Sequence, residues 1–281
     1  MFAAGKWWGH QDSQPIIALH GWLDNAASFD PLIALLPKNL NILALDLPGH
    51  GKSAHYPSCG MFHFTEDICT IRYILRQFGW KNLTFLGHSL GSNYSFIFAS
   101  LYPNAVKRYI GLDILRPFCV DIENFVKAGG ADIDRFLDYE NNKMEPPEYT
   151  MEQLIEHKYK ESRKTINRES CEILLSRGTY PSQKQQSYFG LSRDMRLKIW
   201  FYHSFPHDCL VELTSRVKCE VLSIQYKSGA RFDKPEHIQQ TLDILRVTAK
   251  KFEHHVLDGS HHAHMNNPEQ IATIVTNFIN L

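Results

Sequence analysis

The segment GHSLG (residues 87–91) holds a serine between two glycines. The apolar run LTFL precedes it and the helix-like run SNYSFIFASLY follows it, so the serine falls on a sharp turn from a strand into a helix. Such a turn holds a hydroxyl above the edge of a sheet, and the glycines relieve the crowding around it. The pattern predicts that Ser89 is a nucleophile. The ordinary alternative is a serine that caps a helix.

A serine hydroxyl is a weak nucleophile and needs a base, which a third group must orient. Among the 15 histidines of the chain, those of the loop DGSHHAH (residues 258–264) follow the last strand-like run. Sites in open α/β sheets lie outside the carboxyl ends of the strands, which favours this loop as the source of the base. The rival interpretation is metal binding by His261, His262 and His264. It lacks a carboxylate or cysteine at ligand spacing, so we expect no metal and no cofactor.

Two carboxylates could orient the base. Asp113 ends the run RYIGL, which follows the serine's own strand and helix, and Asp233 lies in the loop after the run EVLSIQY. Both satisfy the chain order serine, acid, histidine that is typical of this arrangement. We prefer Asp113 because a strand end holds a side chain more rigidly than a loop does, and Asp233 remains the alternative acid.

Backbone N–H groups beside the serine could bind the negative oxygen of a reaction intermediate. The residues His20, Gly21 and Trp22 follow the first apolar run, and this loop would bring the N–H of Trp22 near the serine. The N–H of Leu90 would be the second donor. The sequence therefore predicts an oxyanion hole formed by Trp22 and Leu90, with a generic turn after a strand as the alternative.

The elements that would position these residues follow an alternating pattern. Apolar runs that read as buried strands cover residues 15–19, 41–45, 83–86, 108–112, 220–226 and 252–257. Helical periods separate several of them, the clearest with Thr65 as its N-cap and Gly79 just past its end, and a last helix is expected after Pro268. Strands and helices that alternate predict an α/β fold with a mostly parallel sheet covered by helices on both faces.

The strand-like runs stop between about residues 117 and 205, where the sequence becomes polar and helical. The alternating pattern resumes afterwards, so this segment interrupts one sheet domain and does not separate two domains. We therefore expect a core of residues 1–116 and 206–281 and an inserted helical cap of residues 117–205.

Composition excludes several classes of protein. The chain has 281 residues, 43% of them hydrophobic, and 30 basic side chains balance 30 acidic ones, so a globular fold is expected and a nucleic acid partner is not. No apolar run approaches the ~18 residues of a membrane span, and the start of the chain lacks the apolar segment of a signal peptide. We expect an intracellular, cytoplasmic protein without stable membrane insertion. The six cysteines contain no CxxC pair, which is typical of reduced packing thiols.

Together these motifs resemble the α/β-hydrolase superfamily and, within it, the serine hydrolase-like proteins of the kraken type. The stretches that carry the resemblance are KWWG (6–9), LHGWLDNAASFDPLIALLP (19–37), ALDLPGHGKSAHY (44–56), LGHSLGS (86–92), CEILLSRGT (171–179), LSRDMRLK (191–198) and GSHHAHMNNPEQIATIVTNFI (259–279). The resemblance implies an α/β-hydrolase fold with a helical cap, Ser89 as nucleophile and His261 as base. It also implies that His262 and His264 are neighbours of the base.

One departure from the family pattern concerns the acid. Many relatives carry it in a turn after the penultimate strand, and here that turn reads YKSG (226–229), without a carboxylate. A minority of the superfamily, including certain haloalkane dehalogenases, have it at the end of the strand after the nucleophile, which corresponds to Asp113. Dehalogenases and epoxide hydrolases use an aspartate nucleophile, so Ser89 argues against both activities.

Two functions are compatible with these residues. The first is a cofactor-independent serine hydrolase that cleaves a carboxylic ester or a related small acyl substrate through a Ser-His-Asp triad. The second is a catalytically silent ligand-binding or regulatory protein that keeps the hydrolase scaffold, because a fold alone does not guarantee activity.

Overall fold

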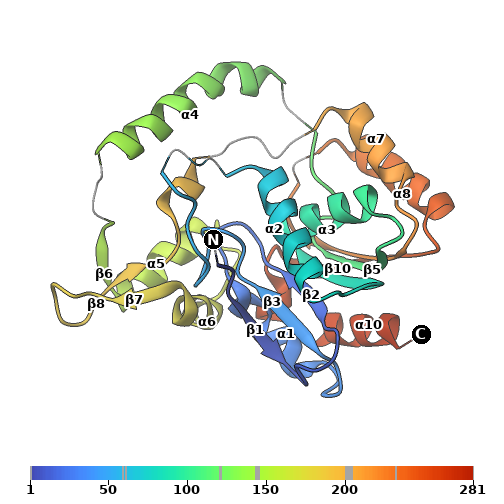
Figure 1. The fold of residues 1–281 in the computed structure, drawn as a ribbon, viewed down its shortest axis with the longest axis horizontal. Coiled ribbons are helices and arrows are strands. Elements are labelled where there is room, and N and C mark those ends of the chain that lie inside the picture. The colour runs from blue at the N-terminus through green and yellow to red at the C-terminus, as the bar shows by residue number, and fades with distance from the viewer. Residues whose placement is uncertain are drawn as a thin grey trace.

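A computed structural model describes residues 2–58, 60, 62–119, 122–142, 146–199, 205–231 and 233–280. Its centre is a seven-stranded sheet with the order β1-β3-β2-β4-β5-β9-β10 (Figure 1). The strands are β1 (Gly5–Trp8), β2 (Ile16–Leu19), β3 (Ile42–Leu45), β4 (Leu83–His88), β5 (Val106–Leu112), β9 (Glu220–Ser228) and β10 (Lys251–Ser260). Only the edge strand β1 pairs antiparallel, so the predicted mostly parallel sheet is confirmed.

Helices cover both faces of the sheet, as the alternating pattern predicts. One face carries α2 (Phe64–Gln77), α3 (Leu90–Leu101), α7 (His207–Ser215) and α8 (Pro235–Thr248). The other carries the 3-10 helix η1 (Ala26–Phe29), α1 (Asp30–Leu35), α9 (Ala263–Asn266) and α10 (Glu269–Ile279). Successive strand residues point to opposite faces: in β4, Phe85 lies in the first core and Leu86 in the second. Both cores therefore hold the central strands in place.

Helix α2 differs from the sequence prediction at its start. It begins at Phe64, and the extended residue His63 is its N-cap, with a ring nitrogen that accepts from the N–H of Thr65. The predicted cap, Thr65, is therefore wrong, because an imidazole here takes the role that Ser, Thr, Asp and Asn usually have. The end of the helix agrees with the prediction, since Gly79 follows with φ +66°.

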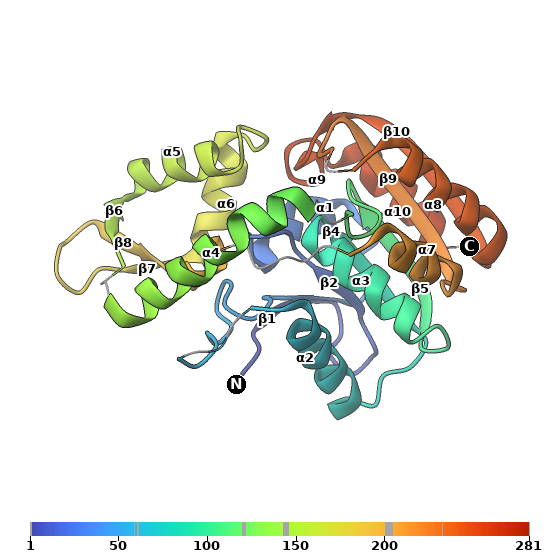
Figure 2. The ribbon, with the colours of Figure 1, turned by 90° about the horizontal axis from the view of Figure 1, so that it is seen from above.

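Between β5 and α7 the chain forms a separate layer of short elements. They are α4 (Ile122–Asn142), β6 (Glu148–Thr150), α5 (Met151–Glu161), α6 (Arg168–Gly178), β7 (Thr179–Pro181), β8 (Tyr188–Leu191) and the 3-10 helix η2 (Met195–Lys198). The strands form a three-stranded antiparallel sheet, which the prediction of a helical insertion did not include. Strands of three or four residues are too short for an alternating pattern to be detected. From above, α4 crosses in front of the core toward this small sheet (Figure 2).

The two ends of this layer lie side by side. Cys119 and Phe205 form an isolated parallel bridge, and the N–H of Phe205 donates to the carbonyl of Phe118 at 3.3 Å. The chain thus leaves the core and returns to it through one narrow neck.

Buried polar contacts dock this layer on the core. The guanidinium of Arg177 in α6 lies 2.7 Å from the carboxylate of Asp46, and the ammonium of Lys158 in α5 lies 2.9 Å from that of Asp24. The side-chain amide of Asn25 donates to the carbonyl of Leu174 at 2.9 Å. Loss of one partner from a buried ion pair costs about 3–5 kcal/mol, so these contacts strongly restrain the layer.

Among the described helices, none is both long and apolar enough to span a bilayer.

Candidate active site

Ser89 lies on the turn between β4 and α3, where the sequence predicts it. Its backbone adopts φ 52° and ψ −112°, a region that residues other than glycine rarely occupy. The glycines of the motif permit this turn. A Cβ on Gly91 would lie 1.9 Å from the carbonyl oxygen of Leu19, and one on Gly87 would lie 2.6 Å from the backbone of Ser92. Close backbone approach at both positions therefore requires glycine.

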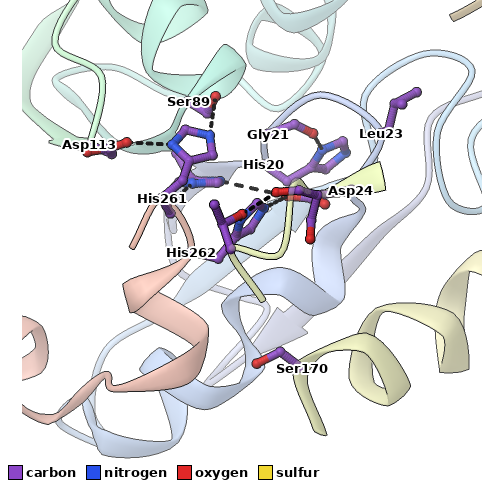
Figure 3. Close-up of polar contacts among 12 residues, drawn as sticks. His20, Gly21, Leu23, Asp24, Ser89, Asp113, Ser170, His261 and His262 are labelled. Atoms are coloured by element: carbon purple, nitrogen blue, oxygen red, sulfur yellow. Dashed lines mark hydrogen bonds and ion pairs between the residues drawn. The ribbon is translucent and has the colours of Figure 1, made fainter. Parts of the chain in front are cut away.

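His261 contacts the serine hydroxyl. It follows β10 directly, and its Nε2 lies 3.0 Å from the Oγ of Ser89 (Figure 3). The imidazole is only 17% exposed, so little solvent competes for this contact. The distance is within the range in which a histidine can take a proton from a serine.

Asp113 contacts the other side of the same imidazole. Its Oδ2 lies 2.5 Å from the Nδ1 of His261, and its side chain is fully buried (Figure 3). The residue follows the last residue of β5 with φ 64°. This conformation turns the carboxylate across the sheet edge toward the β10 loop.

The turn after β9 surrounds the carboxylate of Asp113. The N–H of Tyr226 donates to Oδ1 at 3.2 Å, and the N–H of Ala230 donates to Oδ2 at 2.7 Å. A Cβ on Gly229 would lie 1.9 Å from Oδ1, so only glycine leaves room there. The turn YKSG after β9 has no carboxylate of its own, and it thus binds the carboxylate that follows the neighbouring strand β5.

Asp233 lies elsewhere. Its Oδ2 is 2.7 Å from the guanidinium of Arg116, and its Oδ1 is 3.1 Å from the Nδ1 of His237. Partial burial would raise the pKa of Asp233, but Arg116 and His237 hold it below its usual value. The structure brings Asp113, and not Asp233, to His261.

A buried carboxylate next to the site escaped the sequence prediction. Asp24, 3% exposed, accepts from the ammonium of Lys158 at 2.9 Å and lies 3.2 Å from the Nε2 of His262 (Figure 3). Burial would raise the pKa of Asp24, but Lys158 and His262 hold it well below its usual range. The only signal in the sequence is that Asp24 belongs to the stretch GWLDNA. Its partner Lys158 is 134 residues away, so no local pattern links the two.

Three histidines around His261 are buried and packed together. Burial lowers the pKa of His88, His262 and His264, so these rings are neutral near pH 7. The rings of His88 and His264 lie 4.0 Å apart between centroids, and the Nε2–H of His88 donates to the carbonyl of His261 at 2.9 Å. These neighbours hold the loop that carries His261.

The metal set considered from the sequence, His261 with His262 and His264, does not converge. Within the described part of the chain, His262 instead groups with Asp24 and His88, whose ligand atoms lie within 4.8 Å of one another. The ammonium of Lys158 already occupies Oδ1 of that carboxylate.

A cavity of about 630 Å³ opens above the serine. Trp22 and Leu90, the residues predicted to form an oxyanion hole, line it together with Ser89 and His261. Residues Glu161, Ser162, Arg163 and Thr165 also line it. This volume is within the range of pockets that enclose small molecules.

A mostly parallel sheet with a serine turn after its central strand, β4, and a histidine loop after its edge strand, β10, defines the class of α/β hydrolases. The family described as "alpha/beta hydrolase fold" matches residues 14–268, and the chain belongs to this family.

Individual relatives cover nearly the whole chain. A "Probable serine hydrolase" of Drosophila melanogaster is 37% identical over 98% of this chain and 83% of its own length. "Serine hydrolase-like protein 2" of Homo sapiens is 29% identical over 98% of this chain and 90% of its own length. Among solved structures, a hypothetical protein of Pseudomonas aeruginosa PAO1 aligns with a TM-score of 0.82 and 29% identity, over 99% of this chain and 94% of that one. The resemblance to serine hydrolase-like proteins is thereby confirmed.

Proposed function

We propose that the protein is a serine hydrolase that cleaves a carboxylic ester or a related acyl compound. One observation carries the proposal: Ser89, His261 and Asp113 form an unbroken chain of contacts of 3.0 and 2.5 Å. Ser89 and His261 line a cavity of about 630 Å³, where a small acyl group has room. The names of the relatives support hydrolase activity in general, and the choice of an ester rests on the chemistry of the triad.

The reaction begins with the attack of the Ser89 oxygen on the acyl carbon. His261 Nε2 takes the hydroxyl proton, and the carboxylate of Asp113 stabilises the imidazolium. The backbone N–H groups of Trp22 and Leu90 bind the oxyanion, a contribution of about 3–4 kcal/mol for each donor.

The intermediate then breaks down in two stages. The bond from the acyl carbon to the alcohol oxygen breaks, and the alcohol leaves with the proton from His261. This yields an ester between the acyl group and Ser89. Water, deprotonated by the same imidazole, attacks that ester, and the acid leaves as the proton returns to the serine oxygen.

The segment from residue 117 to 205 acts as the cap of this site. Its residues Glu161, Ser162, Arg163 and Thr165 line the same cavity as Ser89, so the cap limits the shape of the acyl or alcohol group that fits.

Hydrolysis of a panel of fluorogenic carboxylic esters with acyl chains of increasing length tests the proposal. We expect turnover of at least one ester by the wild-type protein and none above background by Ser89→Ala, since the residual catalysis without the nucleophile is several orders of magnitude lower. Binding of an ester without turnover by the folded wild-type protein would instead favour a silent binding protein.

A further inference from the structure

A second cluster of reactive side chains lies at the neck of the cap. Cys119 lies at the start of the cap, His207 is the first residue of α7 just after the cap, and His237 lies in the first turn of α8. The Sγ of Cys119 is 3.6 Å from the Nδ1 of His207 and 3.3 Å from the Nδ1 of His237. All three residues are partly exposed, so ions in solution can reach them.

These distances are those of ligands around one tetrahedral ion. Zinc lies about 2.3 Å from a cysteine sulfur and about 2.0–2.1 Å from a histidine nitrogen, which puts sulfur and nitrogen about 3.6 Å apart in a tetrahedral site. The three ligand atoms of the cluster all lie within 4.8 Å of one another. The rings of His207 and His237 are stacked, with centroids 3.9 Å apart, so one ring must rotate before both Nδ1 atoms can face a common ion.

Hydrogen bonding prepares His207 as a ligand. Its Nε2 lies 2.8 Å from the Oε1 of Gln240, and an amide oxygen only accepts, so Nε2 carries the hydrogen. The lone pair is then on Nδ1, which faces Cys119. An outer hydrogen bond that fixes the tautomer in this way is typical of histidines that bind metals.

Asp233 adds negative charge beside the cluster. Its Oδ1 lies 3.1 Å from the Nδ1 of His237, and its Oδ2 accepts from the guanidinium of Arg116 at 2.7 Å. Its Oδ1 accepts from the Nδ1–H of His237, a hydrogen bond that metal binding to Nδ1 would replace, and Arg116 keeps the carboxylate in place. Asp233 thus has a structural context outside the triad.

We propose that Cys119, His207 and His237 bind one zinc-type divalent ion. Binding displaces the thiol proton, which passes to solvent as the sulfur–metal bond forms, while the Nδ1 proton of His237 moves to its Nε2 through water. The ion then clamps both ends of the cap onto α8. Phe118, next to Cys119, lines the Ser89 cavity, so the clamp also restrains one wall of the active site.

The assignment is tested by adding Co²⁺ to the untagged protein after a chelator has removed any bound metal. We expect one Co²⁺ per chain, a thiolate-to-cobalt absorption band and the release of about one proton per ion. Cys119→Ser and His207→Ala should lose the band. Cys209→Ser changes an exposed cysteine of α7, the helix that begins at His207, and should keep the band. Absence of the band in the wild-type protein, or an unchanged band in Cys119→Ser, would overturn the proposal.

Thermal unfolding gives a second readout that does not need cobalt. Zinc at a hundredfold excess over its Kd should raise the Tm of the wild-type protein by about 5 °C or more and leave that of Cys119→Ser unchanged. Circular dichroism of each variant before metal is added establishes that it is folded. Ser89→Ala should bind metal like the wild-type protein, so failure of the metal site and failure of the proposed hydrolase are distinguishable. Equal zinc shifts in wild-type and Cys119→Ser proteins would contradict the site.

Discussion

At the residue scale, the site depends on two backbone conformations that most side chains avoid. Ser89 and Asp113 have φ angles of 52° and 64°. Such conformations cost of order 1–3 kcal/mol each and persist only where the surroundings enforce them. Here the hydrogen bond from the N–H of Ser89 to the carbonyl of Leu112, at 3.2 Å, holds the first, and the N–H groups of Tyr226 and Ala230 hold the second.

The choice of acid gives a prediction at this scale. Asp113→Asn should lower kcat by about 10³–10⁴, because an amide no longer holds His261 in the right tautomer. Asp233→Asn, the matched change in the alternative acid, should lower kcat by less than about tenfold, since its partners are Arg116 and His237. Steady-state kinetics on one ester compares them. Equal and small losses would remove Asp113 from the mechanism.

The sequence allowed some of these residues to be predicted because they carry local signals. Ser89 has its glycines, and the base was expected in the loop after the last strand. Asp113 could be preferred by its position at a strand end, where a minority of the superfamily carries the acid. Asp24 and Lys158 could not be paired, because their 134-residue separation leaves no local pattern. The same holds for Cys119 and His207, which are 88 residues apart.

At the element scale, most strands of the central sheet and the helices around it could be predicted from apolar runs in the sequence. The elements of the cap could be predicted only in part. The strands β6, β7 and β8 are held by pairing with one another rather than by a periodic pattern. The edge strand β1 was likewise not predicted; it pairs antiparallel with β3. Short strands depend on tertiary partners, so the sequence alone underdetermines them.

The docking of the cap can be tested at Lys158. Lys158→Met leaves Asp24 buried without its ammonium partner, so we expect a loss of about 3–5 kcal/mol in the free energy of unfolding. The ester kcat should also fall, because Lys158 donates to the carbonyl of Leu23 beside Trp22. Lys160→Met changes an exposed lysine of the same helix and should alter stability by less than about 1 kcal/mol. Chemical denaturation measures both. Equal effects would argue that the buried pair does not dock the cap.

The serine turn gives a second prediction for an element. Gly91→Ala brings a Cβ against the backbone of β2 and should cost more than about 3 kcal/mol or prevent folding. Gly129→Ala in α4 meets no atom within 4 Å and should stabilise the helix by up to about 1 kcal/mol. Urea unfolding of the two variants, or their soluble yield, compares them. A mild effect at Gly91 would contradict the close approach of α3 to β2.

At the scale of the whole molecule, a buried carboxyl group couples stability to pH. Burial raises the pKa of Asp67 to about 7, although the hydroxyls of Tyr94 and Tyr56 donate to it. Between about pH 4 and 7 the native state keeps a proton that the unfolded chain has lost. The unfolded chain binds fewer protons, so stability falls as pH rises through this window.

Asp67→Asn should remove this dependence. Between pH 4.5 and pH 7.5, we expect the free energy of unfolding of the wild-type protein to fall by about 3 kcal/mol more than that of the variant. Urea unfolding at the two pH values measures the difference. Parallel losses in both proteins would show that Asp67 is ionised in the native state throughout.

Labelling with a fluorophosphonate, followed by mass spectrometry of the modified peptide, tests most directly whether Ser89 is activated by His261. Our account predicts one covalent adduct on Ser89 of the folded protein, a rate lower by several orders of magnitude in His261→Ala, and no adduct in Ser89→Ala. A folded wild-type protein that stays unlabelled, or one that is labelled equally fast without His261, would contradict it.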